Sequence, residues 1–159
     1  MFTNTPFSAW DLNDEILAGL ADIGWEFSTQ VQKETIPIAL SGKDVIGQAR
    51  TGSGKTAAFG LPIMNACKPT GELQALILAP TRELANQVAE EMSNIQGKTG
   101  LIIQTVYGGT DLEKQARSLG DGVDIIVGTP GRVMDMSERG HIDLTSPTLF
   151  CLDEADRML

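Results

Sequence analysis

The chain carries the stretch VIGQARTGSGKT at residues 45–56. Its apolar beginning, Val45–Ala49, predicts a short buried strand, and a helix is predicted from Lys55 to about Asn65. Between the two, Gly52 and Gly54 allow the backbone to turn successive N–H groups around an anion. The stretch therefore predicts a strand, a phosphate-binding loop and a helix, in that order.

The residue types in this loop suit a nucleoside triphosphate. The pattern GxxxxGK[ST] is matched except at Ala49, which takes the place of the first glycine. Lys55 can reach the β- and γ-phosphates, and Thr56 can offer its hydroxyl to Mg²⁺. The positive end of the following helix points at the same anion. A glycine-rich turn without a ligand is the alternative. The residues predicted to contact the nucleotide here are Arg50, Thr51, Gly52, Ser53, Gly54, Lys55 and Thr56.

Beyond the loop, short apolar runs alternate with segments of helical periodicity. The runs predict strands at Ala75–Ala79, Leu101–Val106, Asp124–Val127 and Leu149–Leu152. The periodic segments predict helices at Arg82–Ile95, Leu112–Leu119 and about Gly131–Arg139. Such alternation indicates an α/β fold, a three-layer sandwich around a mostly parallel sheet. Ligands of such sheets bind at the carboxyl ends of the strands, so the loops at those ends are the candidate site.

The segment before the phosphate loop predicts two helices. Asn13 is a suitable N-cap for an amphipathic helix that Gly24 ends. A second helix is expected from about Thr29 to Leu40, with a bend near Pro37.

Composition restricts the function further. The chain has 159 residues, enough for one domain with a core, and a net charge of −9. A protein that holds nucleic acid by bulk electrostatics should be basic, so any such contact must be local. No apolar stretch is long enough to span a bilayer, and the N-terminus lacks a secretory pattern. Cys67 and Cys151 form no metal-binding spacing and are expected to be buried thiols in a reducing cytoplasm.

The last predicted strand ends in Asp153-Glu154-Ala155-Asp156. A carboxylate at the tip of a strand opposite the phosphate loop can hold Mg²⁺, and Asp153 fits that role. Glu154 can accept a proton from an attacking water. A solvated acidic turn is the alternative, and the phosphate loop favours the catalytic interpretation. The Asp153 carboxylate and the Lys55 ammonium should therefore face each other across a cleft that can hold a magnesium-bound triphosphate.

These four letters spell DEAD, and the chain resembles a DEAD-box RNA helicase along nearly its whole length. Residues 24–32, GWEFSTQVQ, are similar to the family's Q motif, with Phe7 as its isolated upstream aromatic residue. The resemblance implies that Gln32 recognises the adenine edge, that Trp25 packs on the base and that Phe7 supports the pocket. Core packing is the alternative for both aromatic residues. The pattern departs at Ser28 and Gln30, where the family usually has proline, or another small residue at the second position. Trp25 also replaces a more usual Phe or Tyr.

Three further segments resemble family motifs that grip the backbone of single-stranded RNA. They are Pro80-Thr81-Arg82-Glu83-Leu84, Gly108-Gly109 and Thr129-Pro130-Gly131-Arg132, and each follows a predicted strand. All three should therefore lie at one edge of the sheet. Their guanidinium, hydroxyl and backbone N–H groups are phosphate donors that read no base, so binding should be independent of sequence. Taken singly, the first segment could be a helix start with a capping threonine, and the third could be a turn followed by a helix start. The residues implied as RNA contacts are Pro80, Thr81, Arg82, Gly108, Gly109, Thr129, Pro130 and Arg132.

The resemblance also implies an organisation. Residues 1–159 are expected to form the N-terminal RecA-like domain, incomplete at its C-terminus, with a Q-motif region at 7–32. ATP and Mg²⁺ are the implied ligands, and a second RecA-like domain should complete the site. The chain by itself is expected to bind nucleotide without unwinding RNA, and to self-associate through unpaired strand edges. Two rival functions stay open: a related DNA translocase, and a non-enzymatic nucleotide sensor or interaction platform.

Overall fold

The computed structural model describes residues 2–47, 49–50 and 52–158. The chain divides into two compact units. The first comprises Met1–Ala66 with Glu91–Gly100, and the second comprises Cys67–Glu90 with Leu101–Leu159. Each unit has its own secondary structure.

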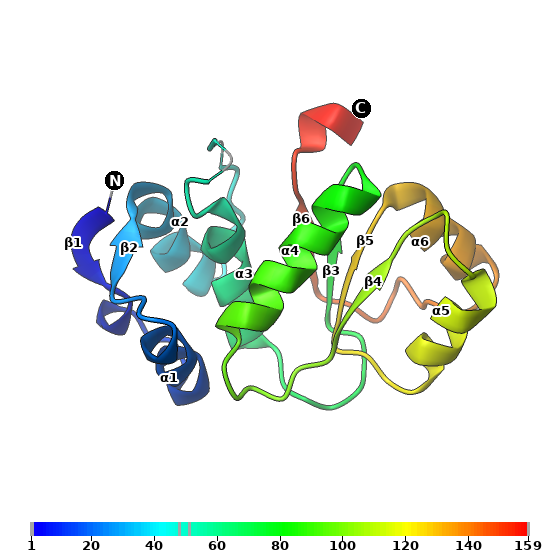
Figure 1. Ribbon diagram of the computed structural model, residues 1–159, viewed down its shortest axis with the longest axis horizontal. Helices are drawn as coiled ribbons and strands as arrows, with labels where there is room; N and C mark the ends of the chain where they lie inside the picture. The colour runs from blue at the N-terminus through cyan, green and yellow to red at the C-terminus, as the bar shows by residue number, and fades with distance from the viewer. Residues whose placement is uncertain (1, 48, 51, 159) are drawn as a thin grey trace. The chain divides into compact units, whose positions relative to one another are not determined.

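The second unit is built on a four-stranded parallel sheet (Figure 1). Its strands are β3 (Ala75–Leu78), β4 (Ile103–Val106), β5 (Ile125–Gly128) and β6 (Leu149–Leu152). They lie in the order β4-β5-β3-β6, and all three neighbouring pairs are parallel. The prediction of a mostly parallel sheet is confirmed. Strand ends differ from the predicted ones by at most two residues, as expected for short apolar runs.

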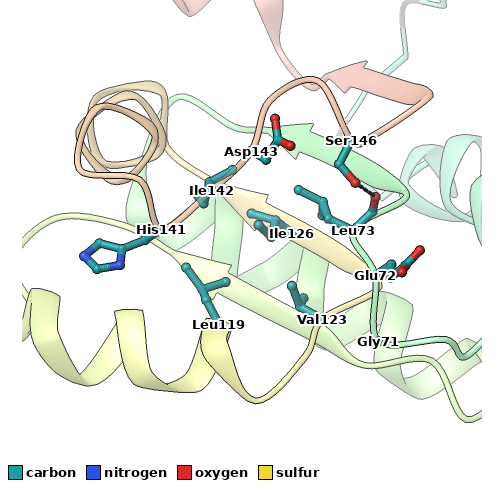
Figure 2. A pocket seen from close by; sticks show the side chains of 10 residues that line it. All are labelled: Gly71, Glu72, Leu73, Leu119, Val123, Ile126, His141, Ile142, Asp143 and Ser146. Carbon is teal, nitrogen blue, oxygen red and sulfur yellow. Dashed lines mark hydrogen bonds between the residues drawn. The ribbon is translucent and has the colours of Figure 1, made fainter.

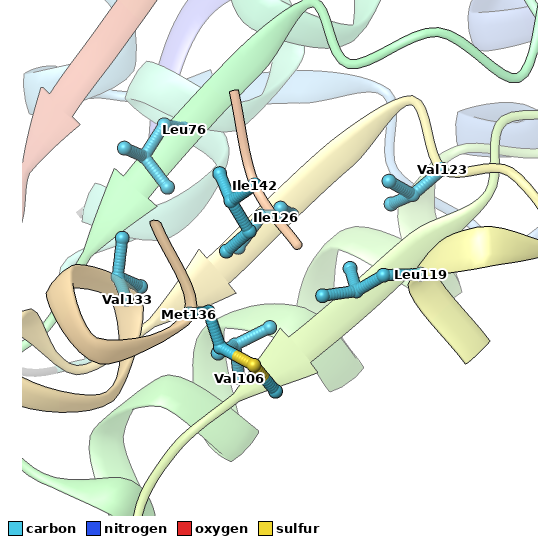
Figure 3. Packing of buried hydrophobic residues seen from close by; sticks show 8 residues of the cluster. All are labelled: Leu76, Val106, Leu119, Val123, Ile126, Val133, Met136 and Ile142. Atoms are coloured by element: carbon cyan, nitrogen blue, oxygen red, sulfur yellow. The ribbon is translucent and has the colours of Figure 1, made fainter. Parts of the chain in front are cut away.

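Helices α5 (Leu112–Gly120) and α6 (Pro130–Glu138) cover one face of this sheet (Figure 3). Val133 and Met136 of α6 pack with Leu76 of β3, Ile126 of β5 and Val106 of β4 in one buried cluster. The alternation of side chains along a strand places the neighbouring residues on the opposite face. The strand residues of that opposite face, Ala75, Ile77, Ile125 and Val127, are fully buried as well. Both faces of the central strands are therefore covered, which explains their continuous apolar sequence.

Helix α4 (Arg82–Ile95) follows β3 and runs from the second unit into the first. The first unit also holds α1 (Asp14–Asp22), α2 (Gln30–Leu40) and α3 (Lys55–Ala66). Asn13 caps α1 through a bond from the Ile16 N–H, as predicted. Thr29 caps α2 in a reciprocal capping box with Gln32, so both helices begin where the sequence indicates. Two short 3-10 segments, Phe7–Ala9 and Ala155–Met158, complete the helical structure of the described residues.

One predicted strand is absent. Residues 43–47 form neither helix nor strand, and the Ile46 side chain is 98% exposed. A buried strand needs a neighbour for its backbone groups, and no described strand pairs with this segment. The apolar run therefore has the composition of a strand without the pairing that would make it one. Gln48, the fourth residue of the predicted strand, lies outside the described residues.

The first unit contains a small antiparallel sheet that the sequence did not predict. Strand β1 (Phe2–Pro6) pairs with β2 (Phe27–Thr29). Neither run shows the apolar alternation that would mark a half-buried strand. The pairing brings residues 2–6 beside the Q-motif segment.

Within the described residues, no helix has the length and apolar character needed to cross a bilayer.

Candidate functional site

The predicted RNA-contacting segments lie at one edge of the parallel sheet. Residues 79–82 follow β3, residues 107–111 follow β4, and residues 129–130 follow β5. Because all four strands are parallel, these loops and the acidic segment after β6 emerge at the same carboxyl edge. The predicted common edge is confirmed, and it lies within the second unit alone.

Arg82 and its neighbours form the loop after β3. The Arg82 guanidinium lies over the Tyr107 ring, 5.3 Å from its centroid, so these two loops contact each other. The Thr81 hydroxyl accepts a hydrogen bond from the Leu84 N–H at 3.2 Å and so caps the start of α4. Its own proton remains a donor for another acceptor. Thr81 therefore caps the helix, which confirms that alternative, and its hydroxyl proton can still be donated to a phosphate.

The loop after β4 presents two exposed glycines. Gly109 has a φ of 80°, and a Cβ built on it would lie 3.4 Å from Nη1 of Arg82. A side chain at this position would strain the backbone and crowd the guanidinium. Glycine at this position therefore leaves room for the Arg82 guanidinium.

The segment after β5 supplies Thr129 and, in the first turn of α6, Pro130 and Arg132. Thr129 is the N-cap of α6 but makes no side-chain capping bond, and Pro130 occupies the first helical position. Both Nη1 and Nη2 of Arg132 donate to the Thr110 carbonyl at 3.3 Å. Nη1 also donates to Oε1 of Gln115 at 3.1 Å. Arg132 is therefore tied to the loop after β4 and is half-buried.

The acidic segment follows β6. Asp153 is buried, with 6% of its surface exposed, and its N–H donates to the Leu78 carbonyl of β3 at 2.8 Å. Glu154 has a φ of 54°, which non-glycine residues rarely adopt. Its carboxylate pairs with Arg157 at 3.1 Å. Such a backbone conformation at the end of a strand is common at functional sites.

The phosphate loop belongs to the first unit. Gly52 and Gly54 have φ values of 84° and 86°, and α3 begins directly after them at Lys55. The N–H groups at the start of a helix point towards an anion placed before it. The Ser53 N–H and hydroxyl both bind the Arg50 carbonyl, which closes the loop on itself. Thr51, also predicted to contact nucleotide, lies outside the described residues.

Gln32 connects the Q-motif segment to this loop. Its Oε1 accepts from the Thr29 N–H at 2.8 Å, and its Nε2 donates to the Gly54 carbonyl at 3.1 Å. A Cβ on Gly54 would lie 2.5 Å from that nitrogen and 2.8 Å from the Thr29 hydroxyl. Only glycine fits this backbone, and the loop is cradled by the first turn of α2. The close packing of Gly54 against Gln32 and Thr29 is consistent with a phosphate-binding loop that has a glutamine carboxamide beside it.

Phe7 and Trp25 lie together. The two rings stack with centroids 6.2 Å apart, and Trp10 meets Phe7 edge-on at 5.9 Å. Phe7 is buried and Trp25 is 38% exposed. The packing alternative therefore describes Phe7, while Trp25 keeps a surface that a base could cover.

Ser28, where the sequence departs from the Q motif, has a structural role here. Its hydroxyl donates to the Thr5 carbonyl at 2.9 Å and lies 2.9 Å from the Thr3 hydroxyl. Ser28 is fully buried. The serine at this position therefore links β2 to β1 through its hydroxyl group.

Lys55 lies in the first unit, and Asp153 in the second. The predicted meeting of the two side chains across a cleft stays a prediction. Within the described residues, no group of three or more His, Cys, Asp and Glu side chains is placed to hold a metal ion.

A pocket of about 420 Å³ lies at the other end of the strands (Figure 2). Val123 and Ile126 line it together with Leu119 of α5, and exposed Glu72 and Asp143 lie around it. These residues precede or begin β3, β5 and β6. No residue predicted to bind nucleotide or RNA lines it.

Three structurally important residues were missed from the sequence. Tyr107 supports Arg82, and Gln115 bonds to Arg132. The third, Asp124, is fully buried and accepts bonds from the backbone N–H groups of Gly71 and Ile102. A polar residue on an apolar helical face was the one local signal for Gln115. The other two could be recognised only with the strands placed side by side.

The chain is similar in sequence to known helicases. The family model described as DEAD/DEAH box helicase matches residues 29–159. The RNA helicase CrhR of Synechocystis is 52% identical over 99% of this chain, which covers 32% of that protein. The ATP-dependent RNA helicase CshA of Listeria monocytogenes is 46% identical over 98% of this chain, which covers 30% of it.

Solved structures agree with the fold. A DEAD box protein from Methanococcus jannaschii has a TM-score of 0.92 and 40% identity, covering 99% of this chain and 43% of that one. A hypothetical ATP-dependent RNA helicase from Sulfolobus tokodaii has a TM-score of 0.84 and 39% identity, covering 92% and 43%. The chain spans about a third of the length of the curated relatives it matches. Its arrangement is that of a RecA-like domain, and the chain belongs to the DEAD/DEAH box helicase family.

Proposed function

We propose that this chain binds ATP with Mg²⁺ and, in its full-length protein, couples ATP hydrolysis to unwinding or remodelling of RNA duplexes. The observation that carries the proposal is the common carboxyl edge, where Arg82, Gly109 and Arg132 emerge beside the Asp153-Glu154 segment. A nucleic-acid surface and an acidic strand end in one sheet allow one ligand to influence the other. Sequence relatives named RNA helicases support RNA as the nucleic acid.

The phosphate loop supplies the nucleotide contacts. The Lys55 ammonium offsets charge on the β- and γ-phosphates, and N–H groups at the start of α3 bind the same anion. Gln32 and the exposed side of Trp25 recognise the adenine, with Phe7 behind the indole. For Gln32 to do so, its bond to the Gly54 carbonyl must be exchanged for one to the base.

The acids supply the hydrolytic chemistry. Thr56 and Asp153 offer the oxygen ligands that Mg²⁺ prefers, partly through water. When bound, the ion neutralises charge that develops on the phosphates. Glu154 accepts a proton from the attacking water, and its present pairing with Arg157 must open to let it do so.

The loops of the carboxyl edge bind RNA through its backbone. Donors come from the Arg82 and Arg132 guanidinium groups, the Thr81 and Thr129 hydroxyls, and the Gly109 N–H. Gly108 and Pro130 shape the loops that present these donors. None of these groups is committed to a base edge, so affinity should vary little with RNA sequence. RNA would be bound by a few placed donors and not by an overall positive charge, which is consistent with the net charge of −9.

The finer organisation is also proposed. Residues 1–159 form the N-terminal RecA-like domain of a cytoplasmic protein, and a second RecA-like domain completes the site. Because the chain spans about a third of its relatives, the isolated chain is expected to bind nucleotide and to hydrolyse ATP negligibly. An arginine finger from another domain is worth roughly 10³–10⁵ in rate.

ATP turnover by the full-length protein, measured with RNA, with DNA and with neither, tests the proposal. RNA should stimulate turnover far more than DNA does. Glu154→Gln should abolish turnover while nucleotide still binds, since the substitution removes the base and keeps the shape. Stimulation by DNA alone would support a translocase instead. Nucleotide binding without turnover under any condition would support a sensor.

A further inference from the structure

Three segments at the carboxyl edge are proposed to bind RNA: the one after β3 that includes Arg82, the glycine loop after β4 (residues 107–111), and the one after β5 that includes Arg132. Gln115 bonds to the last two of these RNA-facing loops. It lies on α5, half-buried, and its side-chain amide points back toward the carboxyl edge of the sheet. Its Nε2 donates to the Tyr107 carbonyl at 3.1 Å and to the Thr110 hydroxyl. Its Oε1 accepts from Nη1 of Arg132 at 3.1 Å. Both polar ends of the amide are therefore used, one on each loop.

We propose that Gln115 is a positioning residue for RNA binding, which fixes the Arg132 guanidinium and the glycine loop in one arrangement before RNA arrives. The inference rests on the proposed function and extends it to a residue that contacts no RNA itself. It concerns only groups within the second unit.

The geometry around Arg132 supports this role. Its Nη1 donates to both Thr110 and Gln115, and its Nη2 donates to Thr110. An arginine carries five N–H donors in a rigid fork. Among the described residues these bonds use three, which leaves the Nε–H and one Nη2–H for a phosphate. The guanidinium is thus held by one edge while another edge can serve RNA.

The glycine loop is held from the same point. The Thr110 hydroxyl donates to the Tyr107 carbonyl at 3.1 Å, and Gln115 bonds to both residues. Gly108 and Gly109 lie between them, so the conformation of the glycines depends on this closure. Tyr107 also lies beneath the Arg82 guanidinium. A change at Gln115 can therefore reach all three RNA-facing loops.

Preorganisation explains why such a residue matters. A mobile arginine and a mobile loop would lose conformational freedom on binding RNA, which weakens affinity. An amide that orders them beforehand removes part of that cost. Leu112, Ala116 and Leu119, on the same face of α5, pack against the apolar core. Gln115 is the polar residue among them, so its hydrogen bonds and not apolar packing account for its place on this face.

The test compares Gln115→Met with the unchanged full-length protein. Methionine keeps the length of the side chain and removes both polar ends. Affinity for single-stranded RNA should fall roughly tenfold, within the range of coupling between contacting residues. Nucleotide affinity should stay unchanged, a split that general loss of stability would not produce. Gln104→Met is the matched control, and it should leave RNA binding intact. Among the described residues, the Gln104 side chain bonds to the Gln115 backbone carbonyl and to neither Arg132 nor the loop after β4.

Two further variants decide the route. If Gln115 acts through Arg132, adding Gln115→Met to Arg132→Met should lower RNA affinity much less than it does alone. Gln115→Glu keeps an acceptor for Arg132 and loses the loop donor, so its RNA affinity should lie between those of Gln115 and Gln115→Met. Equal RNA binding by all Gln115 variants would overturn the inference while leaving the proposed function intact. Failure of the unchanged protein to bind RNA would overturn both.

Discussion

At the scale of single residues, Gly54 shows how one backbone position serves both folding and binding. Its φ of 86° is in the left-handed region, and the space for a Cβ is taken by Gln32 and Thr29. Gly42 has the same φ but nothing within 4 Å of its Cβ position. A substitution at Gly42 would therefore introduce backbone strain alone, whereas one at Gly54 would introduce strain and a steric clash.

We expect Gly54→Ala to lower both stability and nucleotide affinity. Left-handed backbone costs a non-glycine residue about 1–2 kcal/mol. The methyl group would also push away the Gln32 amide, which is proposed to recognise adenine. Gly42→Ala should incur the backbone cost alone, with a smaller loss of stability and nucleotide affinity unchanged. Urea unfolding and nucleotide titration measure the two quantities. Equal nucleotide binding by both variants would show that the cradle around Gly54 has no part in the site.

Cys67 is a second residue with a measurable consequence. Burial, and then the nearby Asp124 carboxylate, raise the pKa of its thiol from 9.0 to about 11. A folded pKa above the unfolded one stabilises the fold below pH 9, and this stability is lost as pH rises toward 11. Cys67 fits the prediction of a buried thiol, and Cys151 is half-buried.

In a Cys151→Ser background, thiolate absorbance should therefore rise only as pH approaches 11. The stability of this protein relative to a version with Cys67→Ala should decrease between pH 9 and pH 11. Thiolate that forms near pH 9 in the folded protein would contradict the expected burial.

At the scale of elements, β6 is the strand with the most exposed apolar surface. It pairs with β3 on one side, and no described strand pairs with its other side. Phe150 and Leu152 are 61% and 60% exposed. Both are in register with β3 residues whose side chains belong to the covered face, but the cover of α5 and α6 does not extend over them. An apolar edge strand of this kind pairs readily with other chains.

The chain is therefore expected to self-associate, and Phe150→Lys should shift it toward monomer. A charge on an edge strand opposes pairing with a second copy. Met134→Lys is the control, because Met134 is an exposed apolar residue on helix α6 rather than on a strand. Light scattering over a range of concentrations measures the effect. Association that responds equally to both substitutions would point to general surface hydrophobicity instead of the edge.

At the scale of the whole molecule, Asp124 ties the amino ends of three strands. Its two carboxylate oxygens accept bonds from Thr70 and Gly71 before β3, and from Ile102 before β4, at 2.8–3.1 Å. Asp124 itself directly precedes β5. This buried carboxylate thus fixes the stagger of the sheet at the edge opposite the candidate site.

We expect Asp124→Ala to destabilise the fold strongly. Hydrogen bonds to charged groups contribute about 1.5–3 kcal/mol each, and the variant removes the buried acceptor of three partly buried backbone N–H groups. The free energy of unfolding should fall by roughly 3 kcal/mol or more, measured with urea. Asp121→Ala, at an exposed aspartate three residues away, should change it little. Equal effects of the two substitutions would show that the carboxylate does not order the strands.

The sequence by itself determined the helices, four parallel strands and the chemistry of the motifs. Helix starts at Asn13 and Thr29 could be predicted because a cap acts within three residues of itself. The common edge of Arg82 and Arg132 followed from strand direction alone. Local chemistry, periodicity and parallel topology were sufficient for these features.

Tertiary structure decided the rest. Val45 and Ile46 have the composition of a strand and form none, because a strand exists only with a neighbour. The β1–β2 pair forms where little in its sequence marked a strand, because backbone partners were available. Gln115 and Asp124 gain their roles from groups distant in sequence, which no local pattern specifies. Hydrogen bonds across the chain depend on which segments meet, and only the folded molecule sets that.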